Sequence, residues 1–495
     1  MRWTLQLRAW AGLAMAMALA TAAQAQPARA PDQTLSGTLT AAAHQTYVEV
    51  PFMVPPGTER LTIEFVYTGQ EQKSVIDLGL RDPERLRGWS GGNKDRFTLS
   101  ATDATPSYLA GSIKPGTWRL ILGAPNIRKD ARAEYVARLW FDRAGAPPAE
   151  LSAAAGPGAE RWWRGDLHMH TAHSDGACLS RKGARVPCPV FKTLEAAATR
   201  GLDFVAVTDH NTTSHFDALR ELAPYYDDLL ILAGREITTF HGHANVFGPT
   251  ADIDFQLGGP RAPRIADIQA QAAKAGGLFS INHPGLPSGE FCMGCGWTAP
   301  DTDYSAVQAI EVVNGGFAEG PLSGLAFWEA RLNEGRRITA VGGSDNHDAG
   351  LDPRKAPAIG VPTTVVWASQ LSQAEILGAI RRGHVFIDVA GTADRLLEVS
   401  ARSGTDVAQM GDTLAAPAGG KIAVEVHVAG AAGGRVRLAG DAATLATPGD
   451  LSIGSGDQTL AFDLTADGAA RWLRIDVLAP DGKLILLGNP IYLRP

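Results

Sequence analysis

The sequence predicts a mixed α/β domain flanked by two all-β, sandwich-like domains. Three observations lead to this fold class. Apolar residues alternate with polar ones over residues 31–143, helical and strand-like segments alternate over residues 161–391, and apolar alternation returns over residues 392–495. At 495 residues the chain is also too long for one compact core, so several domains are expected.

Residues 1–25 have the features of an export signal. Arg2 and Arg8 give a positive start, residues 9–20 are apolar, and residues 23–25 (Ala-Gln-Ala) have the small-x-small form of a cleavage site. The alternative is a membrane anchor, but the apolar run is shorter than the roughly 20 residues that span a bilayer. We therefore expect a periplasmic or secreted protein, after signal cleavage, with no membrane span.

The first β domain, residues 31–143, is predicted from strands with one apolar face. One such strand carries Leu61, Ile63, Phe65 and Tyr67 on the same side, and "YVARLWF" repeats the pattern further along the chain. The stretch that follows, residues 144–160, is rich in Ala, Pro and Gly. This composition is typical of a linker and marks a domain boundary.

The α/β domain, residues 161–391, is predicted from helices that end at glycine and are followed by short apolar strands. "LEAAATRG" precedes "LDFVAVTDH", and "IADIQAQAAKAGG" precedes "LFSINHPG". Repeated βα units indicate a mainly parallel sheet. Beyond residue 391, alternation resumes with Ile422, Val424, Val426 and Val428, which predicts the second β domain, residues 392–495.

Nine of the 12 histidines lie in the α/β domain, between His168 and His347. In "DLHMHTAHSDG", His168 and His170 are two residues apart, so a strand can direct both imidazoles to one point. Most of the others follow predicted strands, where open α/β sheets keep their active sites. The further candidates at such positions are Asp175, Asp209, His210, Glu236, His241, His243, His283, Asp345 and His347.

Singly, each of these residues could be structural, but together they exceed the four ligands that one zinc ion takes. The pattern therefore predicts two or three divalent metal ions. Imidazole and carboxylate ligands without thiolate suit manganese, iron or zinc. A hydroxide that bridges two such ions is a ready nucleophile, so we expect a metal-dependent hydrolase.

These motifs resemble those of the polymerase and histidinol phosphatase (PHP) domain of metal-dependent phosphoesterases. "DLHMHTAHSDG" is similar to the opening motif, "VTDHN" to the second, Glu236 and "NHPG" to the middle ones, and "GSDNH" to the closing motif. The resemblance covers about Trp163 to Val389. With β domains on either side and an export signal, the plan resembles more narrowly the carbaryl-hydrolase-like subgroup. The resemblance implies a distorted (β/α)7 barrel.

The resemblance also implies a ligand set. One metal would take His168, His170, Glu236 and Asp345, and Glu236 would bridge to a second metal that also takes His243 and His283. A third would take Asp175, His210 and His347. The residues expected to act in catalysis are Glu236, His210 and His347. The weakest assignment is His243, because His241 faces the same side if the segment is extended.

The leading activity is hydrolysis of small phosphomonoesters or phosphodiesters, the most common chemistry of the resembled family. The alternative is hydrolysis of a carbamate, ester or amide, which the subgroup implies. A third hypothesis is a non-catalytic binding scaffold, which the complete ligand set disfavours. A net charge of −7 without a basic cluster argues against nucleic acid, so the expected partner is a small-molecule substrate.

The four cysteines lie close to the predicted ligands. In an exported protein an even number favours disulfides, and we prefer the local pairs Cys178 with Cys188 and Cys292 with Cys295. A zinc knuckle held by all four thiolates is the alternative.

Several polar residues adjoin the predicted ligands. Asp166, Asn211 and Asn282 could orient ligands or simply form turns. Basic residues could meet an anionic substrate, although a solvated surface position is the commoner situation. These are Arg181, Lys182 and Arg235.

Overall fold

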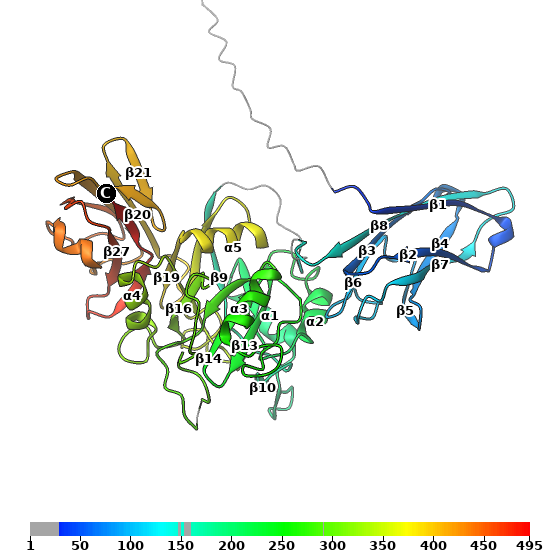
Figure 1. Cartoon of the computed structure of the whole chain (residues 1–495), viewed down its shortest axis with the longest axis horizontal. Coiled ribbons are helices and arrows are strands. Elements are labelled where there is room, and N and C mark those ends of the chain that lie inside the picture. Colours follow the sequence, from blue (N-terminus) through cyan, green and yellow to red (C-terminus); the bar gives the residue numbers. More distant parts are fainter. Residues whose placement is uncertain (1–28, 147–149, 153–159, 291) are drawn as a thin grey trace, which may run out of the picture.

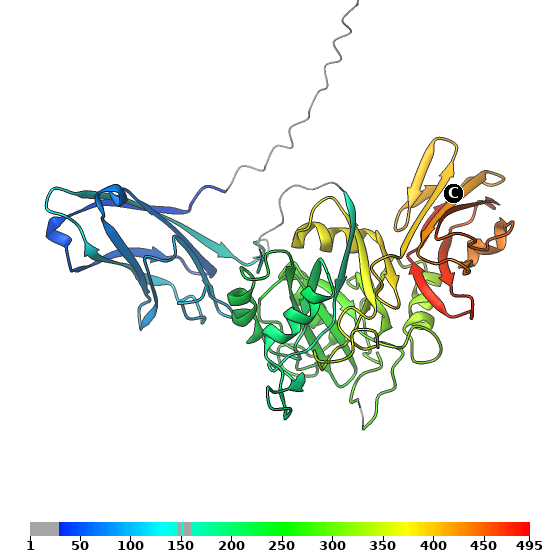
Figure 2. The same ribbon diagram turned by 180° about the vertical axis from the view of Figure 1, so that it is seen from behind.

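A computed structural model of the protein describes residues 29–146, 150–152, 160–290 and 292–495. It shows a β arm, a central α/β region and a C-terminal β region in a row (Figures 1 and 2). The predicted export signal, residues 1–25, lies outside the described residues, as does most of the predicted linker, residues 144–160. No helix in the described part of the chain is long and apolar enough to cross a membrane.

The N-terminal region consists of two antiparallel four-stranded sheets. Its strands are β1 (Gln33–Thr40), β2 (Tyr47–Val54), β3 (Thr58–Tyr67), β4 (Val75–Arg81), β5 (Leu86–Gly91), β6 (Arg96–Ser100), β7 (Gly116–Asn126) and β8 (Arg132–Arg143), with short 3-10 helices η1 (Ala41–Ala43) and η2 (Gln70–Gln72). The sheet orders are β1-β8-β3-β6 and β2-β7-β4-β5. The alternating strands bury one face each, and Leu61, Ile63 and Trp118 are completely buried in their shared core.

The central region is a mixed sheet with helices packed on it. Its strands are β9 (Arg161–Asp166), β12 (Phe204–Val207), β13 (Leu230–Thr239), β14 (Gly242–Phe247), β15 (Leu278–Ile281), β16 (Ala309–Asn314), β17 (Thr339–Gly343), β18 (Thr363–Ala368) and β19 (Val385–Asp388), and a hairpin of β10 (Ala177–Leu179) and β11 (Arg185–Pro187) stands apart. The helices are α1 (Val190–Thr199), α2 (His215–Leu222), α3 (Ile265–Lys274), α4 (Leu325–Asn333) and α5 (Gln373–Arg382).

Local sequence signals explain these elements. The short strands β12 and β15 are buried at every residue, as expected where helices cover a parallel sheet. Helix α5 begins after Ser372, whose hydroxyl accepts a hydrogen bond from the Glu375 backbone N–H, and it ends at Gly383 with a φ of 82°.

The strand order in the central sheet is β17-β16-β15-β14-β13-β12-β9-β18-β19. Strands β9, β12 and β13 are parallel, as are β15, β16 and β17, whereas β14 is antiparallel to both of its neighbours. "HGHANVFG" thus forms the return strand of a hairpin between parallel strands. Strand β18 is likewise antiparallel to both of its neighbours, β9 and β19. Among the described residues β17 and β18 form no backbone ladder, although the Thr364 hydroxyl bridges to Gly342. The predicted α/β class is confirmed in this coarser form, as a mixed domain with parallel strands.

The C-terminal region is antiparallel apart from one parallel pair. Its strands are β20 (Leu396–Ser403), β21 (Asp406–Gln409), β22 (Thr413–Ala415), β23 (Lys421–Ala429), β24 (Arg435–Ala439), β25 (Ala446–Thr447), β26 (Asp457–Thr465), β27 (Arg471–Leu478), β28 (Leu484–Gly488) and β29 (Ile491–Arg494), with a 3-10 helix η3 (Asp441–Leu445). One sheet has the order β21-β20-β23-β26-β25. Strand β28 pairs with β19, so the central sheet continues past residue 391 into the C-terminal region.

Candidate metal centre

All nine predicted ligand residues converge at one end of the central sheet. Loops and strand ends supply them. His168, His170 and Asp175 follow β9, His210 follows β12, Glu236 lies in β13, His243 in β14, His283 follows β15, and Asp345 and His347 follow β17. Their side chains form overlapping groups, one of which also includes Cys295, and within each group the possible ligand atoms lie within 4.8 Å of one another. The structure therefore places together every residue of the predicted set.

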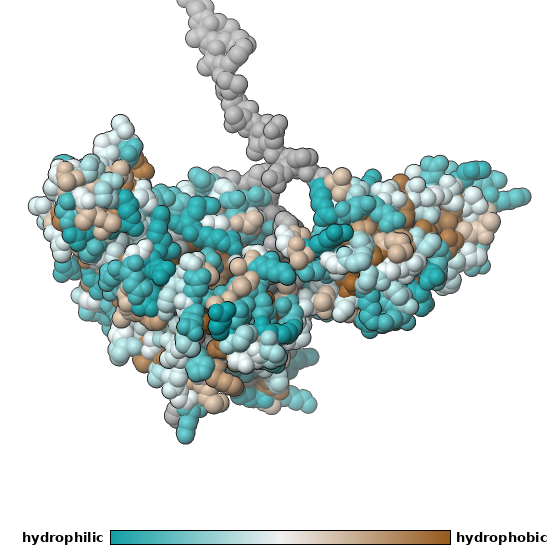
Figure 3. Space-filling model, in the orientation of Figure 1, coloured by the Kyte–Doolittle hydropathy of each residue, from teal (hydrophilic) through white to brown (hydrophobic). Residues whose placement is uncertain are grey.

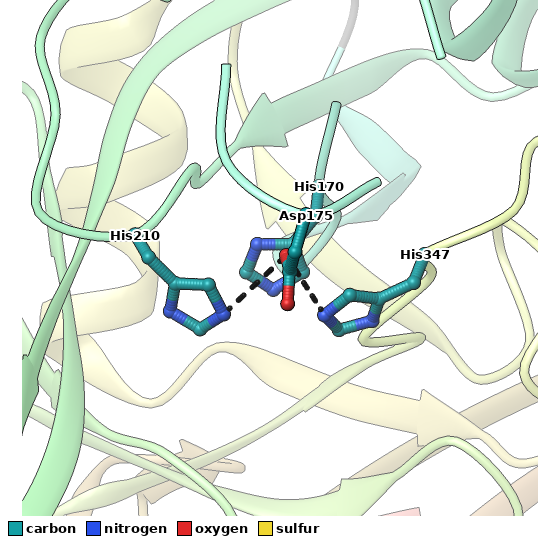
Figure 4. A group of neighbouring side chains, drawn as sticks. All are labelled: His170, Asp175, His210 and His347. Carbon is teal, nitrogen blue, oxygen red and sulfur yellow. Dashed lines mark ion pairs between the residues drawn. The ribbon is translucent and has the colours of Figure 1, made fainter. Parts of the chain in front are cut away.

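The outer group consists of His170, Asp175, His210 and His347 (Figure 4). The Asp175 Oδ1 atom lies 3.3 Å from His347 Nε2 and 3.7 Å from His210 Nε2. The His170 ring stacks between the other two imidazoles, with centroid distances of 4.2 and 4.3 Å. Asp175 and His347 are partly exposed, so this group opens to solvent.

The inner group surrounds the buried carboxylate of Glu236. Its Oε1 atom lies 3.4 Å from His168 Nε2, 3.4 Å from His243 Nδ1 and 3.6 Å from His283 Nε2. Its Oε2 atom lies 2.7 Å from His210 Nδ1. Glu236 thus touches imidazoles of the inner group and of the outer group.

Asp345 completes the inner group from the other side. Its Oδ1 atom lies 3.3 Å from His168 Nε2 and 3.1 Å from His170 Nε2. Asp345 has a φ of 53°, and two other residues at strand ends, Asn211 and His283, have φ values of 54° and 27°. This left-handed backbone conformation costs free energy for residues other than glycine, and residues that adopt it are concentrated at functional sites.

The buried polar atoms and the separations between the donors indicate whether this cluster fits metal ions. His168 Nε2 is buried and makes no hydrogen bond, and the buried Glu236 Oε2 contacts His210 Nδ1 at 2.7 Å outside hydrogen-bond geometry. Such atoms are costly to bury unless something else satisfies them. Ligands bound at about 2.1 Å around one tetrahedral ion are roughly 3.4 Å apart, close to the 3.3–3.6 Å separations here. The donor set therefore fits divalent metal ions.

The tautomer of His168 supports the same conclusion. Its Nδ1 atom lies 3.0 Å from Glu311 Oε1, so this nitrogen carries a proton and donates a hydrogen bond to the carboxylate. The Nε2 lone pair then points to the inner group. Glu311 also accepts hydrogen bonds from the His283 backbone N–H and from Asn314 Nδ2.

Sequence reasoning missed Glu311. A carboxylate in the middle of the apolar strand "AIEVVN" was the available signal, because such a charge is buried only when it is paired. A second signal was Gly343 in "VGGSD". A Cβ atom there would lie 2.4 Å from Glu311 Oε1 and 2.5 Å from His168 Cβ, so only glycine permits their contact.

The structure separates His243 from His241. His243 is 5% exposed and directs Nδ1 to Glu236, whereas His241 is exposed and belongs to none of the convergent groups. The two histidines do not face the same side because Phe240 and His241 form the tight turn between β13 and β14. The extended segment that would have aligned them begins only at Gly242.

The predicted local disulfides, Cys178–Cys188 and Cys292–Cys295, are confirmed. The alternative zinc knuckle is wrong, because no cysteine is free in the described part of the chain. The loop of the second disulfide contacts two predicted ligands. His243 Nε2 lies 3.3 Å from the Met293 carbonyl oxygen, and His283 Nδ1 lies 3.2 Å from the Cys295 carbonyl oxygen. These contacts leave the other nitrogen of each ring facing Glu236.

The charges of the centre shift its pKa values strongly. Burial alone would raise the pKa of Glu236, but the surrounding imidazoles of His168 and His210 hold it well below its usual value. Burial likewise opposes protonation of His347, yet Asp175 and Asp345 raise its pKa to about 9. Without metal ions, protons thus balance the carboxylates, and divalent cations would compete with those protons.

The three polar residues that adjoin the predicted ligands in sequence make different hydrogen bonds. Asn282 Nδ2 donates a 2.8 Å hydrogen bond to Glu236 Oε1 and so orients this carboxylate. Asp166 accepts hydrogen bonds from the backbone N–H groups of His168, Ser344 and Gly360, and it ties ligand loops together. Asn211 bonds to the backbone of Thr238.

The other polar and basic candidates lie outside the nine-residue cluster. Asp209 accepts hydrogen bonds from the Thr171 backbone and hydroxyl and from Ser174, so it fixes the loop that carries Asp175. Arg235 is 3% exposed and pairs with Asp252 at 3.5 Å, which rules out the solvated position expected for it. Arg181 and Lys182 are exposed in the turn between β10 and β11.

Comparison with known proteins finds only distant likeness. No protein-family model and no curated protein matches the sequence. The structure of PsfC from Pseudomonas syringae PB-5123 is 20% identical, with a TM-score of 0.28 over 44% of this chain and 88% of PsfC. That of a proposed metal-dependent phosphoesterase from Bifidobacterium adolescentis ATCC 15703 is 18% identical, with a TM-score of 0.27 over 39% of this chain and 90% of that one. At these TM-scores neither likeness indicates a function, which has to be inferred from the side chains.

Proposed function

We propose that this protein is a metal-dependent hydrolase that acts on small phosphomonoesters or phosphodiesters. The observation that carries the proposal is the buried Glu236 carboxylate, which has several imidazoles at 2.7–3.6 Å, among them that of His168, whose buried Nε2 atom makes no hydrogen bond. We further propose an exported protein whose central region is a distorted (β/α)7 barrel of the PHP type.

The inner and outer groups together supply three proposed ligand sets. His168, His170, Glu236 and Asp345 hold one ion, and Glu236 with His243 and His283 holds a second. Asp175, His210 and His347 hold a third. Manganese, iron and zinc all suit these ligands. Divalent ions here would activate water for attack and neutralise charge on the phosphoryl oxygens.

The protein's own residues position the reaction. Glu236 contacts both groups, so it sets their separation, and Asn282 fixes its rotamer. Asp175, His347 and His210 are the ligands that reach the solvent-accessible side, because 58%, 37% and 26% of their side chains are exposed. A substrate oxygen that enters from solvent therefore meets these three side chains first.

Apolar side chains beside the centre support a second candidate activity, the hydrolysis of aryl carbamates, esters or amides. Phe240 is 84% exposed and Met293 is 69% exposed, and both lie in the loops next to His243. Large exposed apolar side chains often mark a binding surface. They would suit an aryl leaving group on either a phosphorus or a carbonyl centre.

The test is an activity assay of metal-stripped protein reloaded separately with manganese, iron and zinc. The substrates are 4-nitrophenyl phosphate, bis(4-nitrophenyl) phosphate, 4-nitrophenyl acetate and 1-naphthyl methylcarbamate. We expect at least two metal ions per chain by elemental analysis, and hydrolysis of the phosphate esters that chelation abolishes. Preferential hydrolysis of the carbamate would favour the second candidate, and full activity of the stripped protein would refute both.

A further inference from the structure

The second sheet of the N-terminal region presents an unusual outward face, which we call the Trp89 face. Register places its side chains in rows across β5, β4, β7 and β2. Gly79 lies opposite Trp89 and Ile121, and Gly123 lies opposite Asp77 and Tyr47. The residues of the face are Tyr47, Glu49, Asp77, Gly79, Arg81, Trp89, Arg119, Ile121 and Gly123.

Two glycines leave a surface without side chains on which the Trp89 indole packs. A Cβ atom on Gly79 would lie 2.5 Å from Trp89 Cε3, and one on Gly123 would lie 2.7 Å from Trp89 Cη2. The six-membered ring therefore rests directly on the backbone of β4 and β7. Any side chain at either position would lift the ring from the sheet, so the glycines are what allow an indole to lie across this surface.

The outer side of this aromatic surface is open. Trp89 is 37% exposed and Tyr47 is 74% exposed, with their rings edge to face at 5.7 Å. Burial of large aromatic side chains normally stabilises a protein, so an exposed aromatic pair on a flat surface indicates a binding site for a ligand. The space-filling view shows both hydrophobic (brown) and hydrophilic (teal) surface on the N-terminal region (Figure 3).

Charged groups border the aromatic pair. Glu49 pairs with Arg119 at 3.2 Å and with Arg81 at 3.8 Å, and all three side chains are more than 40% exposed. Asp77 lies beside Gly123, next to the rings, and its carboxylate makes no hydrogen bond or ion pair among the described residues. The face thus combines a flat apolar centre with hydrogen-bond acceptors and donors at its edge.

We propose that the Trp89 face binds pyranose residues of a polysaccharide. A pyranose ring has a C–H face that packs on an aromatic ring, and equatorial hydroxyls that need partners in the plane of the sugar. Trp89 and Tyr47 supply the first contact. Asp77 and Glu49 accept hydrogen bonds from hydroxyls, while Arg81 and Arg119 donate them.

Two observations favour this occupant over a protein partner. The four charged side chains cross the face, and a protein interface would have to desolvate them. The N-terminal region also projects from the α/β region in both views (Figures 1 and 2), so its sheet can lie along an extended polymer while the metal centre remains free.

The experiment is affinity electrophoresis of the full-length mature protein in native gels containing hydroxyethyl cellulose, barley β-glucan, galactomannan or xylan. We expect retardation by at least one of these polysaccharides. Trp89→Ala should weaken binding at least tenfold. Gly79→Ala should weaken it as well, because the added methyl displaces the indole without removing any aromatic surface. Tyr225→Ala, which removes a 76% exposed aromatic ring elsewhere, should bind as the parent protein does.

Three results would overturn the proposal. These are no retardation by any of the four polysaccharides, retardation that Trp89→Ala leaves unchanged, and concentration-dependent self-association that depends on Trp89 in place of polysaccharide binding. Sedimentation velocity detects the last. Metal content per chain, measured for each variant, verifies that the rest of the molecule is intact, and it keeps this test separate from that of the hydrolase.

Discussion

At the scale of single residues, Glu311 shows how a residue outside the predicted ligand set can orient the residues within it. Its Oε1 accepts the His168 Nδ1–H, and its Oε2 faces the His283 backbone N–H and the Asn314 amide. One carboxylate thus sets the tautomer of one predicted ligand and the position of another. Partners of this kind usually contribute tenfold to a hundredfold to metal affinity.

Replacing Glu311 by Gln should therefore weaken metal binding by about 10–100-fold. The Gln amide nitrogen would face one of the donors that now share the carboxylate, while the side-chain volume hardly changes. Metal affinity is measured by competition with a chromogenic chelator. Glu221→Gln, an exposed substitution on α2, is the matched control, and equal affinities of the two variants would contradict the role given to Glu311.

The adjacent histidines of the β13–β14 hairpin provide a second residue-scale test. His243→Ala should remove one metal ion per chain and reduce turnover by orders of magnitude, because Nδ1 of this ring faces Glu236. His241→Ala should leave both metal content and turnover nearly unchanged, since its side chain is exposed in the turn. Elemental analysis and initial rates check both variants, and the reverse ranking would show that the wrong histidine was assigned.

At the scale of elements, each disulfide braces a different part of the metal centre. The 292–295 loop offers its carbonyl oxygens to His243 and His283. The Cys178–Cys188 bond closes the β10–β11 hairpin, where the Ala177 N–H donates to the His347 carbonyl oxygen. Short covalent loops restrict the positions that these backbone groups can adopt.

The double variant Cys292→Ser/Cys295→Ser should consequently lose affinity for the metal held by His243 and His283, while the outer group retains its ion. Cys178→Ser/Cys188→Ser should show the opposite selectivity, because its hairpin adjoins Asp175 and His347. Titration with Mn²⁺, followed by electron paramagnetic resonance, counts tight and weak sites in each variant. Identical stoichiometry and affinity in both variants and the parent would refute the bracing role.

At the scale of the whole molecule, a buried charge cluster joins the N-terminal region to the α/β region. The fully buried Asp103 carboxylate lies 2.5 Å from Arg60 of its own region and 2.5 Å from Arg220 of α2. Thr250 also donates a hydrogen bond to it. Burial opposes its ionisation, but the two guanidinium groups hold the pKa of Asp103 far below its usual value.

Asp103→Ala should destabilise the protein by about 3–5 kcal/mol, because it leaves two buried arginines without their partner. The sign of the pH dependence follows from the depressed pKa. The stabilisation is complete above about pH 5, where the unfolded carboxyl is almost fully ionised, and it is lost as pH falls through the unfolded pKa toward the lower folded value. Urea unfolding at pH 7 and at pH 3 measures both effects, with the exposed Asp130→Ala as control. A stability loss at pH 7 no larger than that of the control would contradict the prediction.

Much of the fold and the centre could be predicted because it depends on local pattern. Apolar alternation and glycine-terminated helices predicted the class of each region. Polar residues placed just after apolar strands predicted a candidate set, from which the family resemblance selected the nine residues that the structure brings together. The local cysteine pairs were the preferred choice among the three pairings that four cysteines allow, which sequence alone does not decide. The antiparallel course of β14 was not predictable, because a short apolar run has the same pattern in either direction.

The sequence by itself therefore determined which residues are available for a metal centre and at which strand ends they lie, because side-chain period and chain order are local properties. Only the tertiary structure decided how they meet. Strand pairing places Glu236 between two groups of imidazoles, the turn at Phe240 and His241 selects His243, and Gly343 lets Glu311 reach His168. The same holds for the Trp89 face, whose two glycines and indole lie on three strands. Contacts between residues far apart in the chain depend on register and packing, which no local pattern encodes.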